Sequence, residues 1–236
     1  MLENKLNMKK KGFTLAEILI TIGIIGVIAV ITLTGIYQKY QASVVETRLQ
    51  KFYADMNNVI RLSEFENGDK TSWETSNVDT MWDTYFAPYI KDKKKLCKVR
   101  NKYAFERSDG SIYTINKDHV NFYTSNKCFK KCSEYILSTR KNELAGFGGK
   151  CLFQFGIFPQ GAARYYNATQ KKQLVDAHLG KGLEPYLVWW DGKQNSLWKG
   201  SKYACSKNAE FRQYCTAVIK FNGWKIPPNY PFKVWF

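Results

Sequence analysis

An uninterrupted apolar run near the start of the chain constrains its fold more than any other feature. Residues 18–36 contain no charged side chain and are dominated by isoleucine, valine and leucine. A helix needs about 20 such residues to cross the hydrocarbon core of a bilayer. The 236-residue chain is otherwise polar, with a mean hydropathy of −0.41. One apolar run on a polar remainder predicts a membrane-anchored protein and argues against a multi-span transporter.

The residues before this run predict its orientation. Lys9, Lys10 and Lys11 stand directly ahead of the apolar segment, and positive charge at this place keeps that end of a helix in the cytoplasm. A secretory signal peptide would carry its small-residue cleavage site after the apolar region. The chain continues there as Tyr-Gln-Lys-Tyr, residues 37–40. An uncleaved signal anchor is therefore the simplest interpretation of charge and hydropathy alone.

Glu17 is not explained by a plain anchor. A carboxylate at the centre of a membrane helix costs about 2.5–3.5 kcal/mol, so an acid beside an apolar run needs a partner. Residues 11–19 read Lys-Gly-Phe-Thr-Leu-Ala-Glu-Ile-Leu. This segment resembles the prepilin signature of the type IV pilin and type II secretion pseudopilin superfamily: a basic leader, Gly12, Phe13, Glu17 and then an apolar run.

The resemblance implies a processing site and an assembly contact. A prepilin peptidase/N-methyltransferase of the bacterial inner membrane would cut between Gly12 and Phe13 and methylate the new Phe13 amine. Glu17 would then pair with the Phe13 amine of a neighbouring pilin or pseudopilin subunit, and two buried opposite charges are tolerated together when each alone is costly. The mature protein would cross the inner membrane once, with its N-terminus cytoplasmic and its head extracytoplasmic.

An amphipathic stripe follows the apolar run. Apolar residues recur at steps of three and four from residue 42 to residue 59, which predicts a helix face for packing. The pattern extends one helix from Phe13 to about Glu66, roughly 80 Å at 1.5 Å per residue. We expect four parts: a prepilin leader at 1–12, a transmembrane and filament-core helix at 13–38, its amphipathic continuation at 39–66 and a globular head at 67–236.

The head shows the turn chemistry of an antiparallel sheet. Residues 103–107 and 111–115 flank an Asp-Gly pair and predict a hairpin. Residues 186–190 and 196–198 around the next Asp-Gly pair predict a second one. Residues 82–90 are expected to form a short helix, and residues 209–219 a helix or strand. The fold class is therefore α+β and pilin-like, a long N-terminal helix packed against an antiparallel sheet.

All six cysteines follow the apolar helix, which indicates disulfides on the exported side of the membrane. Six cysteines allow 15 pairings, and the spacing selects none of them. The family often staples its C-terminal region, so the resemblance favours Cys205 with Cys215; Cys128 with Cys132 is an alternative if that segment turns. The competing interpretation of the Cys128 and Cys132 spacing is a zinc site, which lacks a second ligand pair. The candidates are Cys97, Cys128, Cys132, Cys151, Cys205 and Cys215.

No catalytic constellation stands out. His119 and His178 have no metal-ligand spacing, and the glycine-rich residues 146–151 lack the Ser/Thr of a phosphate loop. Residues 191–195 are the nearest match to a calcium loop of the family but carry too few acids. We expect no enzymatic activity, cofactor or metal.

The charge of the head leaves two further interpretations open. The chain carries a net charge of +16, with 36 Lys+Arg against 20 Asp+Glu. Basic clusters among aromatic residues are typical of nucleic-acid binding but also of an ordinary solvated surface. The main expectation is a structural pilus or pseudopilus subunit. The alternatives are a DNA-binding or adhesive minor pilin of the competence type and a simple membrane-anchored extracytoplasmic binding domain. The candidate DNA contacts are Lys93, Lys94, Lys95, Lys130 and Lys131.

Overall fold

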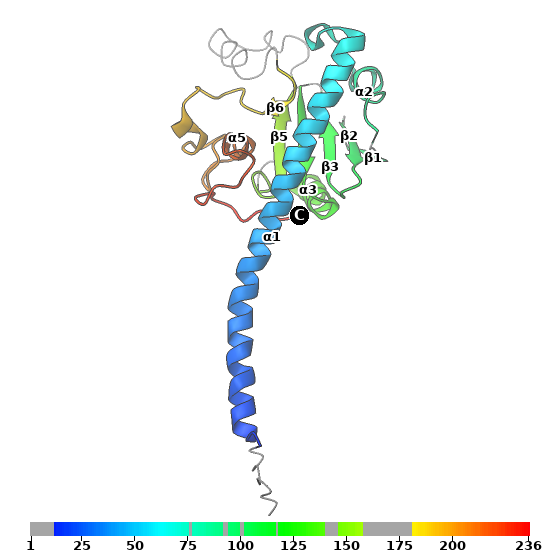
Figure 1. Ribbon diagram of the computed structural model, residues 1–236. Coiled ribbons are helices and arrows are strands. Elements are labelled where there is room, and N and C mark those ends of the chain that lie inside the picture. Colours follow the sequence, from blue (N-terminus) through cyan, green and yellow to red (C-terminus); the bar gives the residue numbers. More distant parts are fainter. Residues whose placement is uncertain are drawn as a thin grey trace, which may run out of the picture. The chain divides into compact units, whose positions relative to one another are not determined.

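The computed structural model describes residues 12–75, 77–91, 94–99, 102–116, 118–139, 146–157 and 181–236, without the side chains of 95–99, 102 and 134–139. It divides into two compact units, Met1–Tyr40 and Gln41–Phe236. Helix α1 (Leu15–Asn67) runs through both (Figure 1). The single long helix expected from the apolar run and the amphipathic stripe is therefore confirmed.

Within the unit Gln41–Phe236, the described strands form one antiparallel sheet in sequence order. The strands are β1 (Lys94–Val99), β2 (Lys102–Glu106), β3 (Ile112–Ile115), β4 (His119–Tyr123), β5 (Leu152–Gly156) and β6 (Glu184–Pro185). The expected hairpin is β2–β3, in which Phe105 pairs with Tyr113 across the turn that contains Gly110 at φ +75°. Because this φ favours glycine, the Asp-Gly pair positions the turn.

One face of the sheet packs against the second half of α1. The register aligns Phe105, Tyr113, Phe122 and Phe153 across four strands, and all four are buried in one cluster with the α1 stripe. Phe52 of α1 stacks on Phe122 with ring centroids 4.5 Å apart. The apolar residues that recur at steps of three and four thus lie on one face of α1. This face packs against every second residue of each strand, because alternate strand residues point to the same side of the sheet.

The opposite face of the sheet contacts helix α3 (Asn126–Thr139). Successive strand residues point to opposite faces, so Ala104, Ile112, Tyr123 and Leu152 form a separate buried cluster with Cys128, Phe129 and Cys132 of α3. The sheet therefore lies between α1 and α3 (Figure 1). The long helix on the antiparallel sheet is the α+β fold that was predicted, whereas the layer formed by α3 was not expected from the sequence.

Four further short elements lie among the described residues of this unit: η1 (Lys70–Ser72), α2 (Val78–Tyr85), η3 (Gln194–Leu197) and α5 (Cys215–Phe221). The helix expected at residues 82–90 lies earlier, because the side chain of Asn77 accepts a hydrogen bond from Asp79 N at 2.8 Å and starts α2. A helix or strand was expected at residues 209–219. In the structure the helix α5 begins only at Cys215 and ends at Phe221.

The prediction of a second hairpin around residues 191–192 is wrong. Asp191 instead accepts hydrogen bonds from Lys193 N at 3.0 Å and from the Ser196 hydroxyl. These bonds turn the chain into η3 rather than into a returning strand. An aspartate that binds the backbone two residues later favours such a local turn. Within the described residues, the sheet ends at the short strand β6 beside β5, and residues 196–198 do not form a strand of it.

Candidate functional site

The Gly12–Phe13 peptide bond lies just ahead of α1 in an exposed, non-helical stretch. Phe13 is 85% exposed. A Cβ built on Gly12 would meet no atom within 4 Å, so the fold itself places no demand on glycine at this position. The requirement for a small residue would therefore have to come from a molecule that binds this bond. The bond expected to be cut is sterically open within the described residues.

Glu17 and Thr14 cap the start of α1 reciprocally. The Thr14 backbone N–H and hydroxyl both donate to Glu17 Oε2 at 2.8 Å, and Glu17 N donates back to Thr14 Oγ1 at 3.3 Å. This is a capping box, in which a threonine and a glutamate three residues later satisfy each other's backbone N–H groups. The sequence carried this Thr-x-x-Glu signal, yet sequence reasoning assigned Glu17 only an intersubunit role. In the single chain the carboxylate is already held by its own helix.

The helix beyond Glu17 exposes its apolar side chains. Its isoleucine, leucine and valine residues from 15 to 36 are 45–76% exposed. Three threonines interrupt the run, and each hydroxyl donates to a backbone carbonyl four residues earlier: Thr21 to Glu17 O, Thr32 to Ile28 O and Thr34 to Val30 O. Such bonds satisfy polar groups inside lipid. Among the described helices, only α1 is long and apolar enough to cross a membrane.

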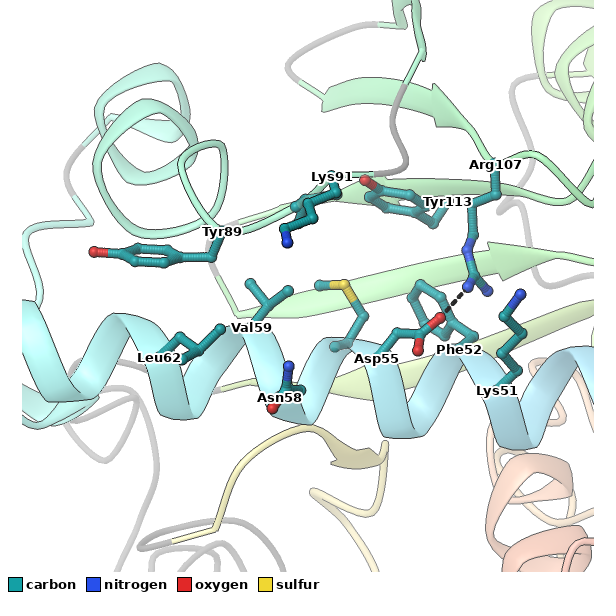
Figure 2. A pocket seen from close by; sticks show the side chains of 12 residues that line it. Lys51, Phe52, Asp55, Asn58, Val59, Leu62, Tyr89, Lys91, Arg107 and Tyr113 are labelled. Carbon is teal, nitrogen blue, oxygen red and sulfur yellow. Dashed lines mark hydrogen bonds and ion pairs between the residues drawn. The ribbon is translucent and has the colours of Figure 1, made fainter.

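The head contains a cavity of about 390 Å³ between α1, the segment after α2, strand β3 and Arg107 in the turn after β2 (Figure 2). Its apolar lining from α1 is formed by Phe52, Met56, Val59 and Leu62. Its described rim carries the cations Lys51, Lys91 and Arg107 against the carboxylate of Asp55. The cavity is therefore electropositive, and sequence reasoning did not identify it.

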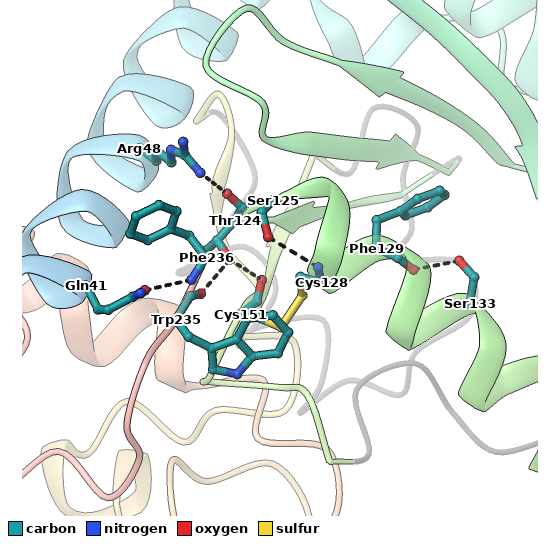
Figure 3. Close-up of a disulfide and its surroundings, with 10 residues drawn as sticks. All are labelled: Gln41, Arg48, Thr124, Ser125, Cys128, Phe129, Ser133, Cys151, Trp235 and Phe236. Carbon is teal, nitrogen blue, oxygen red and sulfur yellow. Dashed lines mark hydrogen bonds between the residues drawn. A yellow bond between two sulfur atoms is a disulfide. The ribbon is translucent and has the colours of Figure 1, made fainter. Parts of the chain in front are cut away.

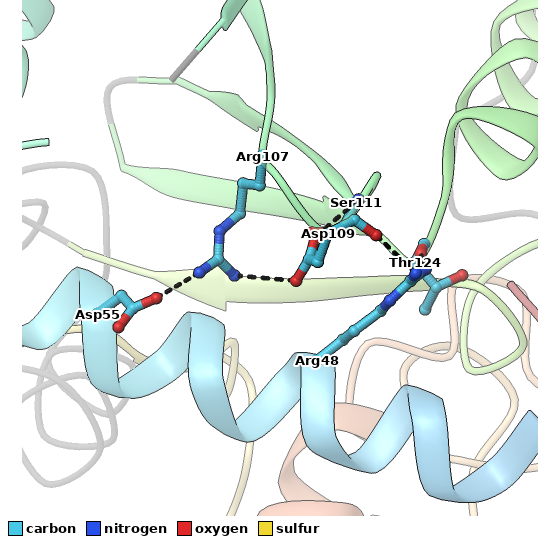
Figure 4. Close-up of polar contacts among 6 residues, drawn as sticks. All are labelled: Arg48, Asp55, Arg107, Asp109, Ser111 and Thr124. Carbon is cyan, nitrogen blue, oxygen red and sulfur yellow. Dashed lines mark hydrogen bonds and ion pairs between the residues drawn. The ribbon is translucent and has the colours of Figure 1, made fainter. Parts of the chain in front are cut away.

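Two arginines connect α1 to the sheet (Figure 4). The buried Arg107 donates to Asp55 on α1, and its other terminal nitrogen lies 3.9 Å from Asp109 Oδ2. Arg48 of α1 donates to the carbonyls of Asp109, at 2.6 Å, and of Thr124. These bonds fix the ends of β2 and β4 against the helix. They form a structural brace rather than a catalytic arrangement.

Lys70 of η1 is 1% exposed and donates to the carbonyl of Ile157. Burial lowers the pKa of its ammonium group to about 8, partly offset by the acids Glu64 and Asp69. A buried lysine is often a catalytic candidate, but this one makes a backbone bond that ties η1 to the end of β5. It is best explained as a structural contact.

Two disulfides are formed among the described side chains. Cys205 and Cys215, the pair favoured by the resemblance, are joined, with Cα atoms 4.6 Å apart. Cys128 is joined to Cys151, with Cα atoms 6.0 Å apart (Figure 3). The alternative pairing of Cys128 with Cys132 is therefore wrong, because α3 places Cys128 against the residue that precedes β5. Cys132 is buried one turn further along α3.

The last residues of the chain are bound close to the Cys128–Cys151 disulfide (Figure 3). Phe236 N donates to Gln41 Oε1 at 3.0 Å, and the Arg48 guanidinium lies 4.8 Å from the centre of the Phe236 ring. Thr124 Oγ1 donates to Trp235 O at 2.8 Å. The end of the chain thus contacts both α1 and the turn after β4, which sequence reasoning did not anticipate.

The candidate DNA contacts lie on different elements. Lys94 is on β1 and forms an ion pair of 3.7 Å with Glu106. Lys130 and Lys131 are exposed on α3, and Lys131 Nζ lies 5.6 Å from the centre of the Trp235 ring. Lys93 and the side chain of Lys95 are outside the described residues, as is the side chain of Cys97.

Among the described residues, no group of three or more His, Cys, Asp or Glu side chains is arranged to hold a metal ion. His119 lies with Nδ1 2.6 Å from its neighbour Asp118, and His178 is outside the description.

Comparison with known proteins gives two matches along the chain. The model of the prokaryotic N-terminal methylation motif matches residues 7–33. This segment, which contains Gly12, Phe13 and Glu17, is thus a prepilin segment of the type IV pilin and pseudopilin kind. The comparisons with curated proteins and with solved structures gave no match. The second family model, described as a family of unknown function, DUF6613, matches residues 35–234. The chain is therefore a pilin-like protein that belongs to the DUF6613 family.

Proposed function

We propose that this protein is a structural subunit of a type IV pilus or a type II secretion pseudopilus. The observation that carries the proposal is the exposed apolar part of α1, most of which lies within the prepilin segment 7–33. An apolar helix surface of this length is stable only in lipid or against other helices. Lipid would cover it before assembly, and the same helices of neighbouring subunits would cover it in a filament.

Gly12, Phe13, Thr14 and Glu17 of the prepilin segment each have a role in this proposal. The peptidase cuts the open Gly12–Phe13 bond, removes residues 1–12 and methylates the Phe13 amine. The new amine lies next to Thr14, the residue that holds the Glu17 carboxylate in the single chain. During assembly Glu17 exchanges part of this cap for the Phe13 amine of a neighbouring subunit. The capping box therefore keeps the acid satisfied until its charged partner arrives.

The four expected parts of the chain take their places in this scheme. Residues 13–38 span the inner membrane and then form the filament core, residues 39–66 support the head, and residues 67–236 are displayed outside the cytoplasm. Charge on the leader and the disulfides of the head favour this orientation. The partners are the prepilin peptidase/N-methyltransferase and other pilin or pseudopilin subunits. Neither family description names nucleic acid, and the candidate lysines give no independent support for a DNA-binding role.

The test separates the charge of Glu17 from its helix-capping function. A glutamine at this position keeps a capping box but carries no charge. In cells of the source organism, Glu17→Gln should leave membrane insertion and cleavage unchanged but greatly reduce the amount of protein in sheared or cross-linked filaments. Glu17→Ala should do the same, and Thr34→Val, a second exposed polar site on the helix, serves as the matched control. Normal assembly of Glu17→Gln would contradict the proposed charge pair.

A further inference from the structure

Strand β1 places the first cysteine of the chain beside a cluster that holds another one. We propose that Cys97 of β1 and Cys132 of α3 form a third disulfide, which ties the edge of the sheet to the helix that covers it.

The register places Cys97 on the α3 face of the sheet. Cys97 lies directly opposite Ala104 in the antiparallel β1–β2 pair. Residues directly opposite each other in such a pair belong to the same face. Ala104 in turn pairs with Thr114, in the row that alternates with the α1-facing row of Phe105 and Tyr113. The position of Cys97 is thus on the side where α3 packs.

Ala104 and Cys132 meet in one buried cluster. Both are 0% exposed, and they share this cluster with Ile112 and Tyr123. Alanine has only a Cβ, so it leaves room above its strand for larger groups from the helix and from the neighbouring strand. Adjacent strands lie about 4.8 Å apart, and the Cα atoms of a disulfide are usually 4.4–6.8 Å apart. Cys97 is therefore one strand spacing from Ala104, a residue that shares a buried cluster with Cys132, and this proximity is what a disulfide between β1 and α3 requires.

The remaining cysteines are already assigned to each other. Cys128 is joined to Cys151 on the same face of the sheet, and Cys205 to Cys215 in a separate cluster with Leu187 and Leu197. Cys128 and Cys132 are four residues apart on α3, so they lie on the same side of the helix. One helix face would then carry two consecutive disulfides, one to the residue before β5 and one to β1.

The bond forms by ordinary thiol–disulfide exchange. The two thiols lose two protons and two electrons as the S–S bond forms. The electrons reduce a disulfide donor of the thiol–disulfide oxidoreductase class to its dithiol through a mixed disulfide. The same class of donor would form the other two bonds, so the third requires no additional chemistry. Its structural consequence would be to anchor β1, the edge strand of the described sheet.

Tryptic mapping of the full chain tests the proposal directly, because trypsin cuts between Cys128 and Cys132. The protein is purified from membranes in detergent without reductant, alkylated while unfolded and digested. The expected linked pair is residues 96–98 with residues 132–140, two hydrogens lighter than the sum of the two peptides. The other bonds give 128–130 with 151–164 and 203–207 with 213–220. The assay is independent of filament assembly, so failure of the proposed function would not affect it.

Single variants provide the control. Cys97→Ser should make Cys132 the newly alkylated residue, and Cys132→Ser should expose Cys97 in the same way, while the other two linked pairs remain. In hydrogen-exchange measurements, the backbone amides of β1 should exchange on the order of tenfold faster in the double variant Cys97→Ser/Cys132→Ser than in the wild type. Alkylation of Cys97 and Cys132 in the unreduced wild type, or linkage of residues 96–98 to 128–130 or 151–164, would overturn the proposal.

Discussion

Substitution of Gly182 by alanine should destabilise the head through one side chain, that of Asn57. Asn57 on α1 holds Leu183 by both backbone groups: Leu183 N donates to Oδ1 at 2.8 Å, and Nδ2 donates to Leu183 O at 3.1 Å. A Cβ on residue 182 would stand 1.9 Å from Asn57 Oδ1 and 3.1 Å from Cγ. The side-chain amide of Asn57 would have to move away, and the backbone N–H and C=O of the buried Leu183 would both lose their hydrogen-bond partner.

The expected magnitude follows from these contacts. A buried polar group that loses its partner costs about 1–3 kcal/mol, so we expect Gly182→Ala to lower the free energy of unfolding by about 2–4 kcal/mol. Asn57→Ala should cost about 1–3 kcal/mol for the same reason. When Asn57 is already alanine, its Cβ lies 3.9 Å from the new Cβ, an ordinary contact. Gly182→Ala should then change stability by less than about 0.5 kcal/mol.

A double-mutant cycle measures this coupling. The wild type, both single variants and the double variant are purified in detergent and unfolded in denaturant, with tryptophan fluorescence as the signal. We expect a coupling energy of about 2 kcal/mol, far above the roughly 0.5 kcal/mol found for independent sites. In thermal unfolding, each kcal/mol should appear as a shift of about 2–4 °C. Additive effects of the two substitutions would refute the proposed clash.

Two further predictions concern the buried lysine and the C-terminal disulfide. Burial lowers the pKa of Lys70 to about 8, against about 10.4 in an unfolded chain. Between these two pH values the folded state therefore binds fewer protons than the unfolded state. Lys70 thus makes the free energy of unfolding rise with pH in this range, by up to about 1.4 kcal/mol per pH unit. Lys70→Met should remove that rise in denaturant titrations between pH 8 and 10, and an unchanged slope would contradict the pKa assignment. The double variant Cys205→Ser/Cys215→Ser opens a loop with a sequence separation of 10 and should be about 3 kcal/mol less stable than the oxidised wild type when both are unfolded without reductant; equal stability of the two would argue against the bond.

The sequence alone predicted the features that depend on local patterns. The α1 stripe contains steps of three and four that only a helix satisfies, and the Asp-Gly pair before β3 carries its own turn geometry. The capping box of Thr14 and Glu17 was not predicted, although it depends on only two residues at a fixed spacing.

The features that depend on distant contacts were not predictable in this way. Arg107 and Asp55 are 52 residues apart, and Asn57 and Leu183 are 126 residues apart. Nothing in the local sequence around either partner marks it as half of a pair. The cavity rim, which includes Arg107, requires the packing of α1 on the sheet and cannot be read from any one segment. The second Asp-Gly pair was misread because Asp191 binds its own following backbone, a local bond that competes with a hairpin.

The mature N-terminus tests the central claim most directly. The full-length protein is expressed in its own host, purified from membranes or filaments, and its N-terminal peptide is analysed by mass spectrometry. We predict a mature chain that begins at Phe13 with a methylated amine. We also predict that the Gly12→Val variant keeps residues 1–12. A side chain at this position meets no atom of the protein itself, so a loss of cleavage would be due to poorer binding by the peptidase. A mature wild-type protein that still begins at Met1 would contradict the account.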